Sequence, residues 1–202
     1  GTPLSFQNCP SRRRATAYYN KTAYRLNVSV TLAPVAGRSD YAANMGSTSY
    51  WGGGSPGSYS AGDVLTEQQW LDDYQSGNTH NGIVYRRSEV PTAMVRDGLS
   101  NTYMVGEKYL MPEYYTTGLG GNDDQAMYVG HDQDVLRGTL WKPLQDRSGV
   151  SSYYSFGSAH SGAFNMAMCD GSVRPISYSI NSQTHLALGA RASGEVIDLS
   201  GL

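Results

Sequence analysis

Residues 158–174 read SAHSGAFNMAMCDGSVR. From position 163 to 169, apolar side chains alternate with small or polar ones, which places Phe164, Met166 and Met168 on one face. A side-chain period of two is that of a β-strand, since neighbouring side chains point to opposite faces. The segment therefore predicts a strand with one buried face.

A tight turn and a second strand follow this strand. Asp170-Gly171 suits a two-residue type I′ turn, because glycine tolerates the positive φ angle that such a turn needs. Residues 173–176 then supply the returning strand of a hairpin. Pro175 has no N–H to donate to a ladder, so the returning strand is predicted to lie at the edge of its sheet.

The same segment resembles the C-terminal signature of a protein family. His160, followed after nine residues by Asp170-Gly171, is similar to the H-x9-DG motif of prepilin-like proteins abundant in planctomycetes, a family of unknown function that is also labelled as solute-binding. Five further segments follow the order of that family's pattern: FQNCPS (6–11), SDYAANMG (39–46), NGIVY (81–85), DGLSNTYMVGEK (97–108) and ALGARASGEV (187–196). The resemblance spans nearly the whole chain.

This resemblance implies an architecture. The expected fold is α+β and mostly β, a pilin-like globular head with an antiparallel sheet, one or two short helices and long decorated loops, forming a single domain over residues 1–202. Family members carry a basic leader and a hydrophobic helix ahead of the head. Here the longest weakly polar run, residues 28–36, is far shorter than the ~18 apolar residues of a membrane helix. The chain is expected to be the C-terminal part of a longer protein that meets a membrane only through that missing helix.

The remaining elements give shorter signals. Thr66 and Gln69 form a capping-box pattern at the start of a helix over 66–74, and Asn181 or Ser182 can cap a second helix that runs to Leu188. Residues 46–62 are rich in Gly, Ser and Tyr and predict a long surface loop. Further strands are predicted at 25–32, 81–86, 102–109, 135–141 and 196–199.

Composition fits an exported domain rich in loops. Charged residues make up 16% of the chain, below the roughly 25% that is typical of globular proteins, while there are 24 glycines and 16 tyrosines. The net charge of -2 gives no electrostatic basis for binding nucleic acid or an anionic membrane. The basic run Arg12-Arg13-Arg14 is predicted to be a solvated turn. With the family resemblance, an extracellular or cell-surface, periplasm-exposed location is expected.

The two cysteines, Cys9 and Cys169, lie far apart in the sequence. The resemblance implies an oxidising compartment and therefore favours a disulfide between them, with two independent thiols as the alternative. Such a bridge would tie the N-terminal segment to the hairpin. Together with His160, Asp170 and Gly171, these cysteines are predicted to be structural.

The sequence contains no complete catalytic motif. Gly53-Gly54-Ser55-Pro56-Gly57 matches the nucleophile elbow of serine hydrolases, but Pro56 has no N–H to offer an oxyanion hole. The four histidines show none of the spacings of a zinc site. The protein is therefore predicted not to be an enzyme.

Two groups of residues could bind a ligand. The aspartates Asp123, Asp124, Asp132 and Asp134 are the densest set of oxygen ligands and form a candidate calcium site, with a solvated acidic loop as the alternative. Aromatic residues beside polar loops could stack on sugar rings, or could only cover a thin core. The aromatic candidates are Tyr50, Trp51, Tyr115, Trp141 and Tyr154.

Two functions of different class follow. The first is a non-enzymatic exported surface protein, a pseudopilin-like head that assembles with other pilin-like subunits or components of a pilus or secretion-type fibre. The second is an extracellular glycan- or solute-binding module that captures polysaccharide with its Tyr/Trp-rich loops.

Overall fold

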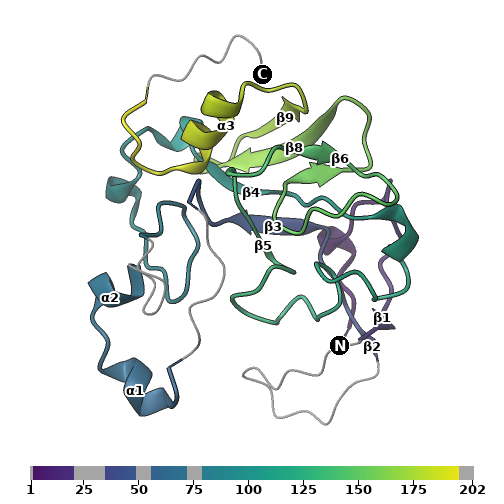
Figure 1. Cartoon of the computed structure of the whole chain (residues 1–202), viewed down its shortest axis with the longest axis horizontal. Coiled ribbons are helices and arrows are strands. Elements are labelled where there is room, and N and C mark those ends of the chain that lie inside the picture. The colour runs from purple at the N-terminus through teal and green to yellow at the C-terminus, as the bar shows by residue number, and fades with distance from the viewer. Residues whose placement is uncertain (1, 21–34, 49–55, 72–78, 196–202) are drawn as a thin grey trace.

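A five-stranded sheet in the order β5-β3-β4-β8-β9 forms the centre of the protein (Figure 1). The structure is a computed structural model and describes residues 2–20, 35–48, 56–71 and 79–195. The strands of this sheet are β3 (Tyr41–Asn44), β4 (Tyr103–Glu107), β5 (Leu136–Arg137), β8 (Ala163–Met168) and β9 (Val173–Ser177). The shorter strands pair separately: β1 (Tyr18–Tyr19) with β2 (Val35–Ala36), and β6 (Leu144–Gln145) with β7 (Gly157–Ser158).

Helices are few and short in the described ranges. The α-helices are α1 (Tyr59–Asp63), α2 (Glu67–Leu71) and α3 (Ser182–Gly189), and the 3-10 turns are η1 (Ser5–Gln7), η2 (Thr92–Met94), η3 (Leu99–Asn101) and η4 (Pro112–Tyr114). The predicted α+β, mostly β class is confirmed. The large sheet is mixed, because β3 and β5 run parallel while its other pairs are antiparallel. Over the described segments, no helix is both long and apolar enough to cross a bilayer.

The predicted hairpin is confirmed as β8 and β9, and β9 lies at the sheet edge as Pro175 requires. The type I′ turn is wrong. Gly171 has a φ of +85°, whereas Asp170 does not adopt a positive φ. Gly171 N donates to Met168 O at 3.0 Å and Met168 N donates to Ser172 O at 2.8 Å, the pattern of a three-residue loop with a glycine bulge. This loop requires a left-handed backbone conformation only at Gly171, so the choice of residue is restricted at that position and not at Asp170.

One face of the sheet carries the main hydrophobic core. Phe164, Met166 and Met168 are completely buried, as their alternation predicts. They pack with Tyr103 of β4 and with Leu188 of α3, which lies beside β8 and β9 (Figure 1). Helix α3 begins as predicted, since the Asn181 side chain accepts hydrogen bonds from the backbone N–H groups of the first turn.

The opposite face of the sheet carries a row of small apolar residues. Cross-strand neighbours share a face, and the register places Ala43, Val105, Ala167 and Val173 in one row across four strands. None of the four is fully buried, and Val173 is 66% exposed. We call this row the outer face.

The predictions for the other helices, strands and loops are confirmed in part. The capping box is confirmed, because Gln69 Oε1 accepts from Thr66 N at 2.9 Å and Gln69 N donates to Thr66 Oγ1 at 3.2 Å. The strand predicted at 102–109 is confirmed as β4, while that at 135–141 shrinks to β5. The loop predicted at 46–62 ends in the helix α1. The strands predicted at 25–32 and 196–199 lie outside the described residues.

The strand predicted at 81–86 is wrong, because this segment closes as a loop against the end of β3. Ile83 N and Val84 N both donate to Asn44 O, at 3.1 and 3.0 Å. A Cβ on Gly82 would overlap the backbone nitrogen of Gly46. The backbones approach too closely for a laddered strand with side chains on both faces.

Candidate functional site: a cysteine, glutamate and histidine cluster

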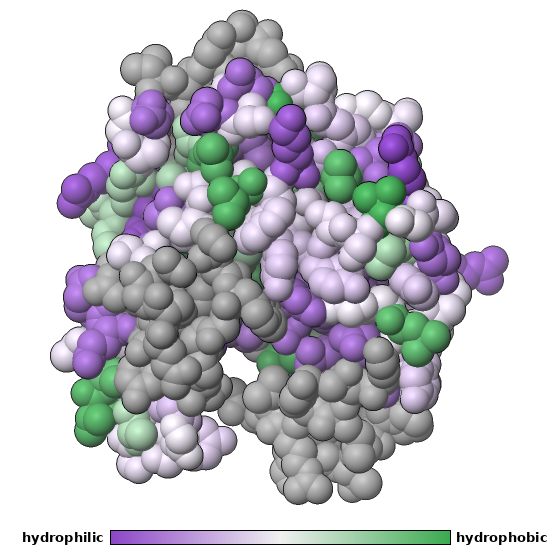
Figure 2. Space-filling model, viewed as in Figure 1, coloured by the Kyte–Doolittle hydropathy of each residue, from purple (hydrophilic) through white to green (hydrophobic). Residues whose placement is uncertain are grey.

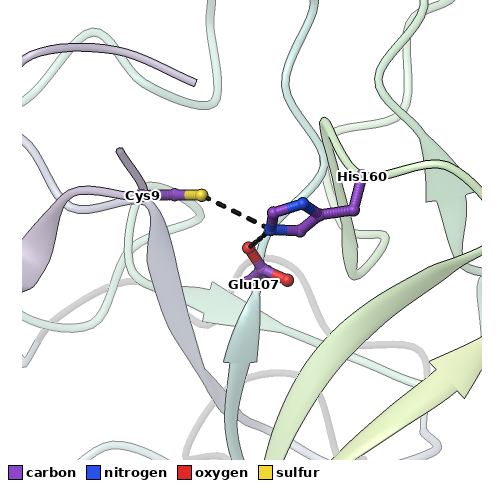
Figure 3. A group of neighbouring side chains, drawn as sticks. All are labelled: Cys9, Glu107 and His160. Carbon is purple, nitrogen blue, oxygen red and sulfur yellow. Dashed lines mark hydrogen bonds and ion pairs between the residues drawn. The ribbon is translucent and has the colours of Figure 1, made fainter. Parts of the chain in front are cut away.

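Three side chains from distant parts of the sequence meet beside the sheet (Figure 3). Cys9 follows η1 in the N-terminal segment, Glu107 is the last residue of β4, and His160 lies in the loop between β7 and β8. Cys9 is 3% exposed and Glu107 1%, whereas the His160 side chain is 36% exposed. The cluster is therefore buried on two sides and open to solvent at the imidazole.

The contacts converge on one ring nitrogen. His160 Nε2 lies 3.6 Å from Cys9 Sγ and 3.2 Å from Glu107 Oε1. Figure 3 shows the thiol and the carboxylate pointing at the same atom from different elements. Ligand atoms of all three residues lie within 4.8 Å of one another.

Neighbouring groups hold Glu107 and His160 in place. Glu107 Oε2 accepts from Asn165 N at 2.7 Å and from Asn165 Nδ2 at 3.1 Å, which leaves Oε1 to face the histidine. The His160 backbone N donates to Ser158 Oγ at 3.1 Å, and the Tyr178 hydroxyl donates to His160 O at 3.0 Å. Both side chains are therefore positioned by the hairpin and its preceding loop.

Cys9 is held by its backbone. Cys9 N donates to Asp40 Oδ2 at 2.7 Å, and Cys9 O accepts from Arg12 N at 2.9 Å. Burial raises the pKa of the Cys9 thiol, a backbone hydrogen bond from Ser11 opposes this, and the nearby charge of Glu107 raises the pKa further. The thiol is therefore protonated at neutral pH and is not primed as a nucleophile.

A buried charge cluster lies beneath Cys9. Arg13 Nη2 lies 2.7 Å from Asp40 Oδ1, and a second Arg13 nitrogen is bonded to Asp123. Lys108 Nζ donates to Asp123 Oδ1 at 2.9 Å. We use the name buried charge cluster for the ion-paired residues Arg12, Arg13, Arg38, Asp40, Lys108, Asp123, Asp134 and Asp146.

The solvated turn predicted for the arginine run is wrong for two of its three residues. Arg12 and Arg13 have side-chain exposures of 0% and 1%, whereas Arg14 is exposed. Arg12 Nε lies 2.8 Å from Asp146 Oδ2, which compensates the buried guanidinium. Because the partners come from residues 40, 123 and 146, nothing in the local sequence indicates this burial.

The four predicted calcium ligands do not form one ligand set. The carboxylate of Asp123 is occupied by Arg13 and Lys108, and these two cations lower its pKa to about 2 although burial raises it. Burial raises the pKa of Asp134 to about 7. Asp132 accepts from Gln125 Nε2 at 3.0 Å. Asp123 and Asp134 form ion pairs within the buried charge cluster. In the part of the chain that the structure describes, the group of side chains that could hold a metal does not include Asp124.

The predicted disulfide is wrong, since both cysteines are free. Cys9 contacts His160, whereas Cys169 Sγ lies 3.8 Å from Tyr103 O. Burial, with a contribution from the charge of Asp170, raises the pKa of Cys169 to about 11. Asp170 and Gly171 lie in the turn of the β8–β9 hairpin, where the sequence predicts them.

The aromatic candidates are dispersed. Trp141 packs on Tyr154 with ring centroids 4.8 Å apart, and both rest on the small core of Met45 and Leu136. The Tyr115 hydroxyl donates to Asp146 Oδ2 at 2.5 Å, which ties it to the buried charge cluster. Tyr50 and Trp51 lie outside the described residues. The described aromatics therefore do not form one platform.

The cluster of Cys9, Glu107 and His160 was only partly visible in the sequence. The sequence pattern assigns His160 to the framework and pairs Cys9 with Cys169, and it does not single out Glu107. A signal existed, because each of the three lies in a different family-pattern segment: 6–11, 97–108 and 158–174.

Comparison with known proteins gives one family. The family model described as a protein of unknown function, DUF1559, matches residues 3–183. No curated protein and no solved structure matches the chain. Because the match covers most of the sequence, the chain belongs to the DUF1559 family.

Proposed function

We propose that this protein is a non-enzymatic, exported surface protein whose domain is a pilin-like head that assembles with other subunits. The observation that carries the proposal is the outer face of the sheet. The opposite face packs on α3, whereas the row of Ala43, Val105, Ala167 and Val173 is only partly buried: Ala43 packs against the small core of Met45 and Leu136, and Val173 is 66% exposed. Small apolar side chains let a second backbone element approach closely, and exposed apolar surface is typical of interaction sites.

The geometry of the cluster differs from that of a nucleophilic catalytic pair. In a nucleophilic pair, a third group orients the histidine through its second ring nitrogen. Here Glu107 and Cys9 face the same nitrogen, Nε2.

The arrangement of other exposed hydrophobic groups is consistent with a specific docking face. Figure 2 shows the hydrophobic side chains on the viewed side as separate spots among polar residues. Exposed hydrophobics such as Leu119 (49%) and Tyr128 (63%) are of the scattered kind that needs no partner. The outer face differs because its members are adjacent across four strands.

A matched pair of variants tests the assembly role. In the full-length protein expressed in its host, Val173→Arg places a charge on the outer face, and Leu119→Arg places one at an unrelated exposed site. Both should keep the melting temperature of the domain. We expect Val173→Arg to be lost from the sheared surface-fibre fraction while Leu119→Arg is retained. Equal incorporation of the two variants would refute the proposal, as would a coding region with no hydrophobic helix upstream of Gly1.

Capture of a glycan or other solute is the second candidate. The family model bears the short name SBP_bac_10, which fits a solute-binding protein, and Trp141 and Tyr154 lie side by side and half-buried. A glycan-array screen of the domain tests this candidate. Saturable binding that is lost in Trp141→Ala, at unchanged circular dichroism, would support it, and an array without signal would dismiss it.

A further inference from the structure

We propose that Cys9, Glu107 and His160 bind a thiophilic divalent cation of the zinc class, with one coordination position open to solvent. Thiolate sulfur, imidazole nitrogen and carboxylate oxygen are the ligands that zinc takes in proteins, and three protein ligands leave a fourth position for water or another molecule. This site lies on the same side of the sheet as the outer face, because Glu107 is two residues along β4 from Val105, but it uses other side chains, so the Val173→Arg and metal-binding experiments can fail independently.

The separations of the ligand atoms fit tetrahedral coordination. With zinc bonds of about 2.3 Å to sulfur and about 2.0–2.2 Å to nitrogen and oxygen, tetrahedral angles require about 3.5 Å between S and N, and about 3.4 Å between N and O. The observed separations are 3.6 Å from Cys9 Sγ to His160 Nε2 and 3.2 Å from His160 Nε2 to Glu107 Oε1. The third pair lies within 4.8 Å, so a small side-chain adjustment completes the set.

The convergence on one nitrogen is better explained by a cation than by hydrogen bonds. Nε2 can carry one proton, which can point well at Glu107 or at Cys9 but not at both. A cation at the shared point would accept a lone pair from each of the three atoms. The alternative without any metal is that His160 Nε2 and the Cys9 thiol both hydrogen-bond to the Glu107 carboxylate, and titration with a metal separates the two.

Neighbouring groups orient the proposed ligand Glu107 and suit a divalent cation. Asn165 binds the second oxygen of Glu107 through two N–H groups, an outer hydrogen bond of the kind that orients metal ligands. A thiolate and a carboxylate together balance a divalent charge. Calcium and magnesium prefer all-oxygen sites, so sulfur and nitrogen ligands select against them. The 36% exposure of His160 leaves a path for entry and for a fourth ligand.

Cobalt(II) is the probe, because it takes zinc sites and reports bound thiolate by a charge-transfer absorption band. Untagged, reduced protein is titrated with Co²⁺ and then with Zn²⁺. We expect one equivalent to bind, with a thiolate band that zinc abolishes. Cys9→Ser should lose the band, whereas Cys169→Ser should keep it, since Cys169 lies elsewhere, near Tyr103.

Further variants distinguish the proposed metal ligands from a residue that only hydrogen-bonds to a ligand. His160→Asn and Glu107→Gln should weaken zinc binding by more than about 100-fold in calorimetric titration, and Asn165→Ala by about 10–100-fold, as expected for an outer hydrogen-bonding partner. Glu113→Gln, at an exposed carboxylate, should leave it unchanged. If the buried Glu107→Gln variant fails to fold, the half-exposed His160→Asn still decides the question.

Two results would overturn the proposal. One is the absence of any stoichiometric cobalt or zinc binding to reduced, folded protein, which would leave hydrogen bonds to Glu107 as the account of the cluster. The other is a thiolate band that persists in Cys9→Ser.

Discussion

Gly82 illustrates how closely the backbone is packed at single residues. A Cβ there would overlap both Gly46 N and the Met45 carbonyl carbon. Backbone atoms cannot rotate away as a side-chain end can, so the structure must shift. We expect Gly82→Ala to lower the free energy of unfolding by about 1–3 kcal/mol, as overpacking does, measured by urea denaturation.

Gly57 provides the control for that substitution. A Cβ at Gly57 would meet nothing within 4 Å, and its φ is not positive. Gly57→Ala should be neutral or slightly stabilising, because alanine restricts the unfolded chain. Equal effects at Gly57 and Gly82 would contradict the close approach.

Adjacent arginines should respond very differently to the same substitution. Arg13→Met removes one charge partner from each of the buried carboxylates Asp40 and Asp123, which then retain Arg12 and Lys108 as partners. Removing one member of a buried pair costs about 3–5 kcal/mol. Arg14→Met, at an exposed position, should produce no measurable change. Thermal and denaturant unfolding of the two variants checks this. Similar stabilities would mean that Arg13 is solvated, as the sequence alone had indicated.

At the scale of elements, the hairpin turn depends on one backbone conformation. Gly171 has a φ of +85°, and a Cβ added there would meet no atom within 4 Å, so a substitution tests conformation without a clash. We expect Gly171→Ala to cost about 1–2 kcal/mol and Gly171→Asn less, because asparagine tolerates the left-handed region. If alanine were neutral in denaturant unfolding, the glycine bulge would be wrong.

Elements with local signals were predictable and elements that need distant partners were not. Alternation gave β8, and the Asn181 cap gave α3, because both signals lie inside the element. Strand β5 holds only two residues, since its pairing with β3 decides where it ends. Likewise, the segment at 81–86 has strand-like residues, but its approach to Gly46 imposes a loop.

At the scale of the whole molecule, acid stability should report the burial of His185. Burial lowers the pKa of His185 to about 4, below its ordinary value of 6.5. The folded state thus binds fewer protons than the unfolded state between these values. The contribution of His185 to stability is complete above pH 6.5 and is lost as the pH falls towards 4, by about 3 kcal/mol.

The variant His185→Leu isolates this contribution. Asp134, whose pKa is raised to about 7 by burial, acts in the opposite direction over part of this range, so the two proteins must be compared at each pH. The free energy of unfolding of wild type should fall relative to His185→Leu by about 3 kcal/mol between pH 7 and pH 4. Parallel curves would show that His185 titrates normally.

Sites assembled from the whole molecule are where the sequence was least informative. Cys9, Glu107 and His160 are brought together by the pairing of β4 with β8 and by the N-terminal segment that lies against β3. Sequence spacing cannot show this, because 98 and 53 residues separate consecutive members (107 − 9 and 160 − 107). The same holds for the buried charge cluster, whose cations and carboxylates come from separate segments.

Anomalous diffraction at the zinc absorption edge tests the metal site most directly. Crystals of reduced protein grown with one equivalent of Zn²⁺ should show one anomalous peak about 2.0–2.3 Å from Cys9 Sγ, His160 Nε2 and Glu107 Oε1. No peak at that point, with His160 Nε2 still bonded directly to Glu107, would contradict the assignment.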